Sequence, residues 1–131
     1  MPNELILIIE DDEKSRKLVR DVLGLKGYRT LDTDTAEEGL RLAQEQHPAL
    51  ILMDIHLPGM NGIEALHSLR RDFATSDIPV IAVTASVMHD QRAQVTSAGF
   101  NALEGKPINI VDFLKTVRRV LDQAVEATAR K

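Results

Sequence analysis

Acidic side chains directly follow two unbroken apolar runs in this sequence. Asp54 follows the run Leu50–Met53, and Glu10 and Asp11 follow the run Leu5–Ile9. If the fold brings these carboxylates together, they repel one another unless a counter-charge is present. A hard divalent cation such as Mg²⁺ relieves that repulsion, because it binds carboxylate and phosphate oxygens. The acids are therefore candidate ligands of a magnesium site.

Two further segments end in other groups that could take part in chemistry. Thr84 ends the apolar run that begins at Val80, and Lys106 follows a short segment at 101–105. A hydroxyl and a fixed ammonium group opposite a metal ion would cradle a transferring phosphoryl group, whose charge spreads over three oxygens. In that arrangement Asp54 is the nucleophile and forms an aspartyl phosphate.

Each of these residues also has an explanation that involves no chemistry. Asp54 could start a turn or cap the next helix, and the acids at 10–13 could simply favour a helix N-terminus. Thr84 could be an ordinary strand residue, and Lys106 could be a solvated surface lysine. The joint pattern favours a site, because each residue follows or ends its own buried segment.

Unbroken apolar runs are typical of strands that are buried on both faces, as in a parallel sheet covered by helices. Strands are expected at 5–9, 28–32, 49–53, 80–83 and 101–105. Helices are expected at 13–26, 36–46, 62–71, 86–98 and 109–127. This alternation predicts a flavodoxin-like, doubly wound (βα)5 fold of the α/β class, with a five-stranded parallel sheet of order 2-1-3-4-5 and helices on both faces. All candidate residues then lie at the carboxyl edge of the sheet.

Local signals set the expected helix boundaries. Thr35 and Glu38 form a T-x-x-E capping box, and Asn61 is placed to cap the third helix. The third helix is expected to bury one face, formed by Ile63, Leu66, Leu69 and Phe73. The helix at 86–98 has few large apolar residues, so it is expected to be the least firmly held.

Composition bounds the class of protein. The chain has 131 residues, of which 44% are hydrophobic and 27% charged, and this suits one domain with a core at about 4–125 and a short tail without an output domain. The net charge of −4, without a run of Lys and Arg, predicts neither nucleic acid nor membrane as a partner. The absence of cysteine excludes disulfides and thiolate metal sites. With no signal peptide or transmembrane span in the sequence, a cytoplasmic location is expected.

The chain resembles the receiver domain of two-component response regulators over essentially its full length. Four ordered motifs carry the resemblance: IIEDDE at 8–13, ILMDIHLPGMNG at 51–62, IAVTA at 81–85 and GKPI at 105–108. The resemblance implies that Asp54 accepts a phosphoryl group from a histidine kinase or a histidine phosphotransfer protein. It implies Mg²⁺ as the cofactor, bound by Glu10, Asp11, Asp54 and the backbone carbonyl of His56.

The resemblance assigns further roles around the expected phosphorylation site. It implies that Thr84 and Lys106 contact the phosphoryl oxygens, and that the bond between Lys106 and Pro107 is cis. The small side chain of Ala85 leaves the approach of the phosphate open. His56 and Ser86 occupy positions that tune the lifetime of the phosphate in the family, although His56 could equally be an exposed loop histidine.

One position departs from the family pattern. Receivers usually carry Tyr, Phe or His three residues before the lysine, and this chain carries Leu103 there. The aromatic part of the usual switch is therefore absent. The signal is still expected to travel through Thr84 to a downstream protein that docks on residues 87–105 and the last helix.

The resemblance and the site residues together predict that the chain is a single-domain response regulator, which switches protein–protein interactions in phosphorelay signal transduction. Such a protein catalyses only its own phosphorylation and dephosphorylation. Three alternatives stay open: a receiver excised from a hybrid histidine kinase, a constitutive interaction module with a vestigial pocket, and an enzyme on the same architecture. A haloacid-dehalogenase-type phosphohydrolase needs a second acid two residues after its nucleophile, where this chain has His56.

Overall fold

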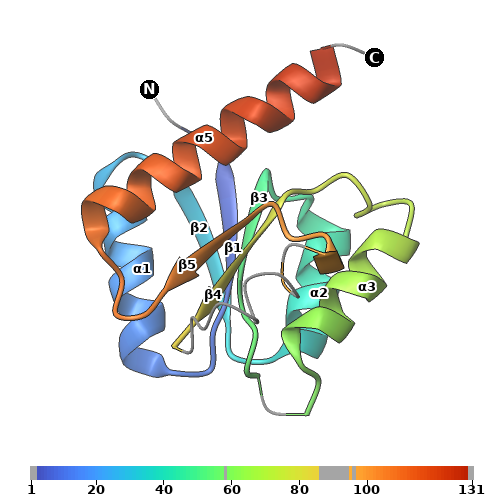
Figure 1. Ribbon diagram of the computed structural model, residues 1–131, viewed down its shortest axis with the longest axis horizontal. Coiled ribbons are helices and arrows are strands. Elements are labelled where there is room, and N and C mark those ends of the chain that lie inside the picture. The colour runs from blue at the N-terminus through green and yellow to red at the C-terminus, as the bar shows by residue number, and fades with distance from the viewer. Residues whose placement is uncertain (1–2, 58, 86–94, 96, 130–131) are drawn as a thin grey trace.

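The computed structural model describes residues 3–57, 59–85, 95 and 97–129. These residues form a sheet between two layers of helices (Figure 1). The strands are β1 (Leu5–Ile9), β2 (Arg29–Thr33), β3 (Leu50–Asp54), β4 (Val80–Thr84) and β5 (Ala102–Gly105). The helices are α1 (Glu13–Leu25), α2 (Ala36–Gln46), α3 (Gly62–Arg71) and α5 (Ile110–Ala129).

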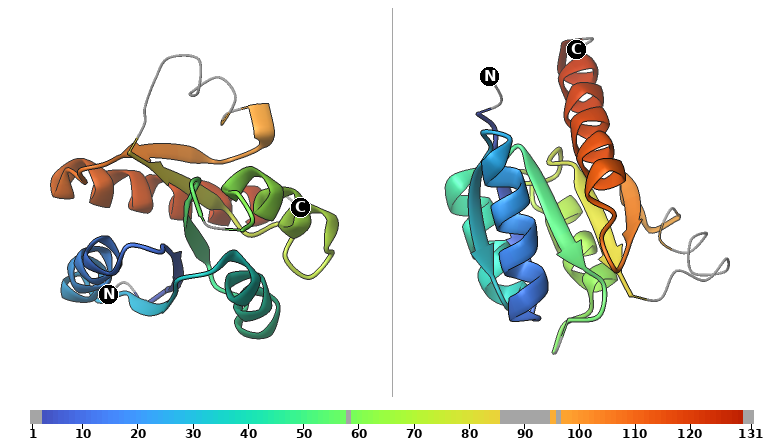
Figure 2. Two further views of the ribbon diagram at one scale, coloured as in Figure 1. Left: turned by 90° about the horizontal axis from the view of Figure 1, so that it is seen from below. Right: turned by 90° about the vertical axis from the view of Figure 1, so that its left-hand side faces the viewer.

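All five strands are parallel, and their order is β2-β1-β3-β4-β5, as predicted. Figure 2 shows α1 and α5 on one face of the sheet and α2 and α3 on the other. β1 is apolar throughout, and β3 and β4 are apolar up to their last residues, Asp54 and Thr84. Successive side chains point to opposite faces, and helices cover both faces. In β1, Ile6 and Ile8 pack with residues of α1 and α5, whereas Leu7 and Ile9 pack with residues of α2 and α3.

Side-chain caps fix the start of all four described helices. At α1, the Asp12 side chain accepts a hydrogen bond from the N–H of Ser15 at 3.0 Å. At α2, Thr35 accepts one from the N–H of Glu38 at 3.2 Å, and at α3, Asn61 accepts one from the N–H of Glu64 at 2.9 Å. At α5, Oδ1 of Asn109 accepts a hydrogen bond from the N–H of Asp112 at 3.1 Å. The predicted caps at Thr35 and Asn61 are confirmed. The Glu38 carboxylate accepts a hydrogen bond from Arg41 and is not seen to accept one from the N–H of Thr35. The structure therefore shows only the Thr35 half of the predicted capping box.

The predicted burial of Phe73 on the third helix is wrong, because that side chain is 96% exposed. The helix ends at Arg71, and the extended backbone of Asp72 turns the following residue away from the helical face. The second strand begins one residue later than predicted. Tyr28, which precedes it, is buried beside α1 and α5.

The predicted cis bond between Lys106 and Pro107 is confirmed. Most of the helix predicted at 86–98, including Ser86, lies outside the described residues. None of the helices in the described part of the chain is long and apolar enough to cross a membrane.

Candidate functional site

Three carboxylates meet at the carboxyl edge of the sheet, as the sequence predicted. Asp54 is the last residue of β3, and Glu10 directly follows the neighbouring strand β1. Both are only 5% exposed, whereas Asp11 is exposed. Oxygen atoms of Glu10, Asp11 and Asp54 lie within 4.8 Å of one another. We call these three residues the acidic cluster.

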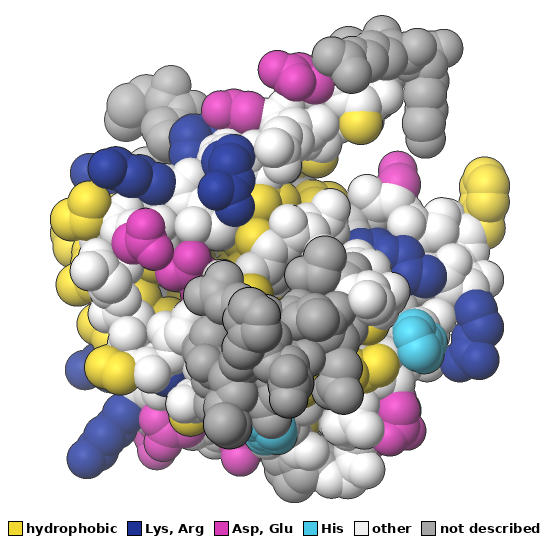
Figure 3. Space-filling view, in the orientation of Figure 1, with side chains coloured by type: hydrophobic (Ala, Val, Ile, Leu, Met, Phe, Trp, Pro, Cys, Tyr) yellow, Lys and Arg dark blue, Asp and Glu magenta, His cyan; other side chains and the backbone are white. Residues whose placement is uncertain are grey.

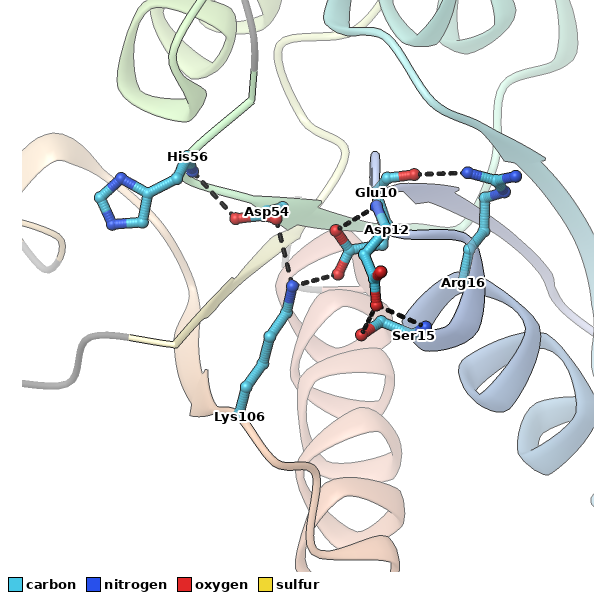
Figure 4. A network of polar contacts seen from close by, with 7 residues as sticks. All are labelled: Glu10, Asp12, Ser15, Arg16, Asp54, His56 and Lys106. Carbon is cyan, nitrogen blue, oxygen red and sulfur yellow. Dashed lines mark hydrogen bonds and ion pairs between the residues drawn. The ribbon is translucent and has the colours of Figure 1, made fainter.

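Lys106 provides the counter-charge of the acidic cluster. Its Nζ lies 3.2 Å from Oδ2 of Asp54 and also forms an ion pair with Glu10 (Figure 4). The side chain is only 18% exposed, so the alternative of a solvated surface lysine is wrong. Its backbone N–H donates to the carbonyl oxygen of Thr84 at 2.8 Å, which holds the lysine at the ends of β4 and β5.

Backbone N–H groups orient the two buried carboxylates. The N–H of His56 donates to Oδ1 of Asp54 at 2.9 Å, and the N–H of Asp12 donates to Oε2 of Glu10 at 3.2 Å. The other oxygen of each carboxylate faces Lys106. The imidazole of His56 points away from Asp54 in Figure 4, and the residue is exposed. A metal-binding role of its carbonyl oxygen and a lifetime-tuning role of its side chain stay predictions.

The two buried acids have opposite pKa shifts. Burial, together with the hydrogen bond to Asp54, raises the pKa of Glu10 to about 7. Burial alone would raise the pKa of Asp54, but contacts with Glu10, the N–H of His56 and Lys106 lower it below its usual value. Burial lowers the pKa of Lys106, but the two carboxylates outweigh this effect and raise it. Asp54 is therefore an ionised carboxylate at neutral pH, as a nucleophile requires.

The predicted site residues Thr84 and Ala85 lie at the carboxyl end of β4, and Leu103 lies within β5. Thr84, the last residue of β4, is buried and lies beside Gly105 of β5. Ala85 follows it and is exposed, which agrees with an open approach. Leu103 is partly buried and packs against the core on the α2 and α3 side of the sheet. The expected contacts of Thr84 and Lys106 with a phosphoryl group, and the role of Ala85 beside it, stay predictions.

Two residues that support the site were not recognised in the sequence. Gly62 begins α3, where a Cβ atom would lie 2.7 Å from Cα of Ile55 and 3.0 Å from the carbonyl oxygen of Asp54. Arg16 of α1 bonds the carbonyl oxygen of Glu10. The Gly at the start of a predicted helix was a visible signal for the first, whereas no local pattern marks Arg16.

The chain resembles known proteins of one family. The family described as "Response regulator receiver domain" matches residues 6–118. The polar-differentiation response regulator DivK of Brucella ovis is 41% identical over 119 residues, which cover 91% of this chain and 97% of DivK.

Two solved structures that share this fold are also more than a quarter identical in sequence. A CheY-like receiver domain protein of Methanospirillum hungatei has a TM-score of 0.87 and 29% identity, and the match covers 95% of this chain and 98% of that one. The receiver domain of a sensor histidine kinase of Pseudomonas aeruginosa has a TM-score of 0.84 and 27% identity, with coverages of 92% and 98%. The latter holds a magnesium ion in its active-site cleft.

Proposed function

Because this chain belongs to the response regulator receiver domain family, we propose that Asp54 is its phosphorylation site and that a histidine kinase or histidine phosphotransfer protein supplies the phosphoryl group. The chain is a DivK-like response regulator of phosphorelay signalling. The observation that carries the assignment of Asp54 is its position next to Glu10 and Lys106, where the side chain is buried and its pKa is lowered.

The proposed step is a phosphoryl transfer between two side chains. A carboxylate oxygen of Asp54 forms a bond to phosphorus while the bond between phosphorus and the histidine nitrogen of the donor breaks. The freed nitrogen of the donor keeps the electron pair of that bond. The ammonium group of Lys106 lies 3.2 Å from Asp54, where it can stabilise the charge on the phosphoryl oxygens. We propose that the chain catalyses only this phosphorylation and the later hydrolysis of its own aspartyl phosphate.

The acidic cluster fits Mg²⁺ as the cofactor. Its oxygen atoms lie within 4.8 Å of one another, and carboxylate oxygens are ligands that this ion prefers. Glu10, Asp11 and Asp54 would hold the ion, together with the backbone carbonyl of His56. When bound, Mg²⁺ neutralises charge on the phosphoryl oxygens. The magnesium ion in the related Pseudomonas receiver supports this assignment.

Mg²⁺ affinity is expected to fall in acid. The ion needs the carboxylate form of Glu10, whose pKa is about 7, so a proton competes with the metal below that pH. Between about pH 8 and about pH 6 the affinity should therefore fall by about tenfold. Titrations with Mg²⁺ at both pH values, followed by amide NMR, measure this change. Glu10→Gln should bind weakly at both pH values, and an equally steep pH dependence in that variant would contradict the assignment to Glu10.

The proposed output is a change in protein–protein contacts at the β5 and α5 side of the molecule. We place the docking site for the downstream protein on residues 87–105 and α5, of which residues 95, 97–105 and α5 are described. Figure 3 views this side, where basic side chains gather over α5, and this helix contains Lys115, Arg118 and Arg119. The kinase partner and the cytoplasmic location stay predictions, as does the expected lack of nucleic-acid and membrane partners.

A titration with Mg²⁺ and then beryllofluoride, which mimics an aspartyl phosphate, tests the proposed function. Amide NMR should show saturable shifts at Asp54, at Thr84 and at Lys106 in the wild type. Shifts that extend to Leu103 and residues 97–105 would show that the chain transmits the signal without the usual aromatic residue. A spectrum that stays unchanged after both additions would contradict the proposed function.

A further inference from the structure

The carbonyl oxygen of Glu10 lies where β1 ends and the chain turns into α1. The N–H of Glu10 still donates to the carbonyl oxygen of Thr33 at 3.0 Å, as in the sheet. Its carbonyl oxygen instead accepts from Nη1 of Arg16 at 2.9 Å (Figure 4). Since a buried backbone carbonyl needs a donor, Arg16 replaces the hydrogen bond that a longer strand would have provided.

Arg16 is itself held by the neighbouring strand. Its Nε lies 3.1 Å from Oδ2 of Asp32 in β2, and the two side chains are only 20% and 25% exposed. The guanidinium group therefore links α1, β1 and β2 at the point where Glu10 leaves the sheet. The two nitrogens that donate to Asp32 and to Glu10 belong to one rigid, planar guanidinium group. The hydrogen bond to Glu10 therefore fixes both the distance and the orientation of its carbonyl group.

We infer that Arg16 is a positioning residue of the acidic cluster: it fixes the backbone of Glu10 so that the carboxylate meets Mg²⁺ together with Asp11 and Asp54. This inference rests on the proposed function. Arg16 bonds the carbonyl oxygen of Glu10, and its charge is matched by Asp32. Lys106, in contrast, forms ion pairs with the carboxylates themselves. Arg16 therefore acts on the geometry of the site, and groups that orient metal ligands commonly change metal affinity by 10–100-fold.

The same helix offers a matched control. Arg20 lies one turn beyond Arg16, and its Nη1 is 3.5 Å from the same oxygen of Asp32. The structure shows a bond from Arg16, but not from Arg20, to the carbonyl oxygen of Glu10. Arg16→Met and Arg20→Met remove the same charge from the same helix, and each keeps an apolar stem. Only the first removes the donor to Glu10.

The test is the Mg²⁺ dissociation constant of the wild type and of both variants, measured by amide NMR because the chain has no tryptophan. Thermal unfolding of each variant is recorded alongside. Arg16→Met should weaken Mg²⁺ binding by about tenfold, and Arg20→Met by less than about twofold. Arg16→Lys, which keeps one donor and the charge, should lie between the wild type and Arg16→Met. It also serves as the test if Arg16→Met does not fold.

Each outcome decides the inference. Equal weakening in Arg16→Met and Arg20→Met would overturn it, because net charge would then account for the effect. Affinity at the wild-type level in Arg16→Met, or in Arg16→Lys if only that variant folds, would overturn it as well. A lower unfolding temperature with unchanged Mg²⁺ affinity would make Arg16 a purely structural residue. A wild type that does not bind Mg²⁺ would instead overturn the proposed function, and the inference with it.

Discussion

Asp54→Asn is expected to abolish the incorporation of phosphate from acetyl phosphate. The amide has nearly the same shape as the carboxylate and still offers an oxygen to the N–H of His56, which bonds Oδ1 of Asp54 at 2.9 Å in the wild type. It lacks the ionised oxygen that attacks phosphorus. Mass spectrometry of the intact protein, after incubation with Mg²⁺ and acetyl phosphate, measures the labelled fraction. The wild type should be labelled and Asp54→Asn should not.

Asp12→Asn provides the control for this experiment. The Asp12 side chain caps α1 by accepting the N–H of Ser15 at 3.0 Å, and asparagine is an equally good cap. The contact that Asp12 makes with Glu10 uses its backbone N–H, which the substitution keeps. This variant removes one nearby negative charge and should still be labelled. A fully labelled Asp54→Asn variant would refute Asp54 as the phosphorylation site.

Gly62→Ala is expected to lower the free energy of unfolding by about 2 kcal/mol. The added Cβ would lie 2.7 Å from Cα of Ile55 and 3.0 Å from the carbonyl oxygen of Asp54. Both neighbours are backbone atoms, so the chain itself must move to make room. The N–H of Gly62 also donates to the carbonyl oxygen of Ile55 at 2.8 Å, and this bond would be strained. Urea unfolding followed by circular dichroism measures the change.

Gly24→Ala is the matched substitution for comparison. A Cβ at Gly24, in α1, would meet nothing within 4 Å. Alanine is also the better helix former, so this variant should be more stable than the wild type by up to about 1 kcal/mol. If both alanine variants unfold at the same urea concentration, close approach is not the reason for glycine at position 62.

The sequence was sufficient to predict the sheet and the meeting of the site residues. Strands buried on both faces leave unbroken apolar runs, and three such runs correspond to β1, β3 and β4. In a parallel sheet, residues at the carboxyl ends of neighbouring strands share one edge. Glu10, Asp54 and Lys106 could therefore be brought together before any distance was known. The caps at Thr35 and Asn61 follow from equally local chemistry.

The features that the sequence did not predict depend on backbone angles and on contacts between distant segments, which a sequence pattern does not contain. Phe73 fits the helical period, but its exposure follows from the backbone angles of Asp72, where the helix has already ended. Arg16 has the spacing of an ordinary exposed helical residue. Its contacts depend on the packing of α1 against the sheet, because its partners, Asp32 in β2 and Glu10 at the end of β1, are brought to it by the fold.

The parallel strand order also determines when the ion pairs of the acidic cluster can form during synthesis. Asp54 and Lys106 are 52 residues apart in the chain, and β5 is the last strand to be made. A nascent chain that has released only β1, β2 and β3 from the ribosome already contains Glu10 and Asp54, but it lacks their cation. The two buried carboxylates therefore gain their ion pairs with Lys106 only after the fifth strand has been made and has joined the sheet.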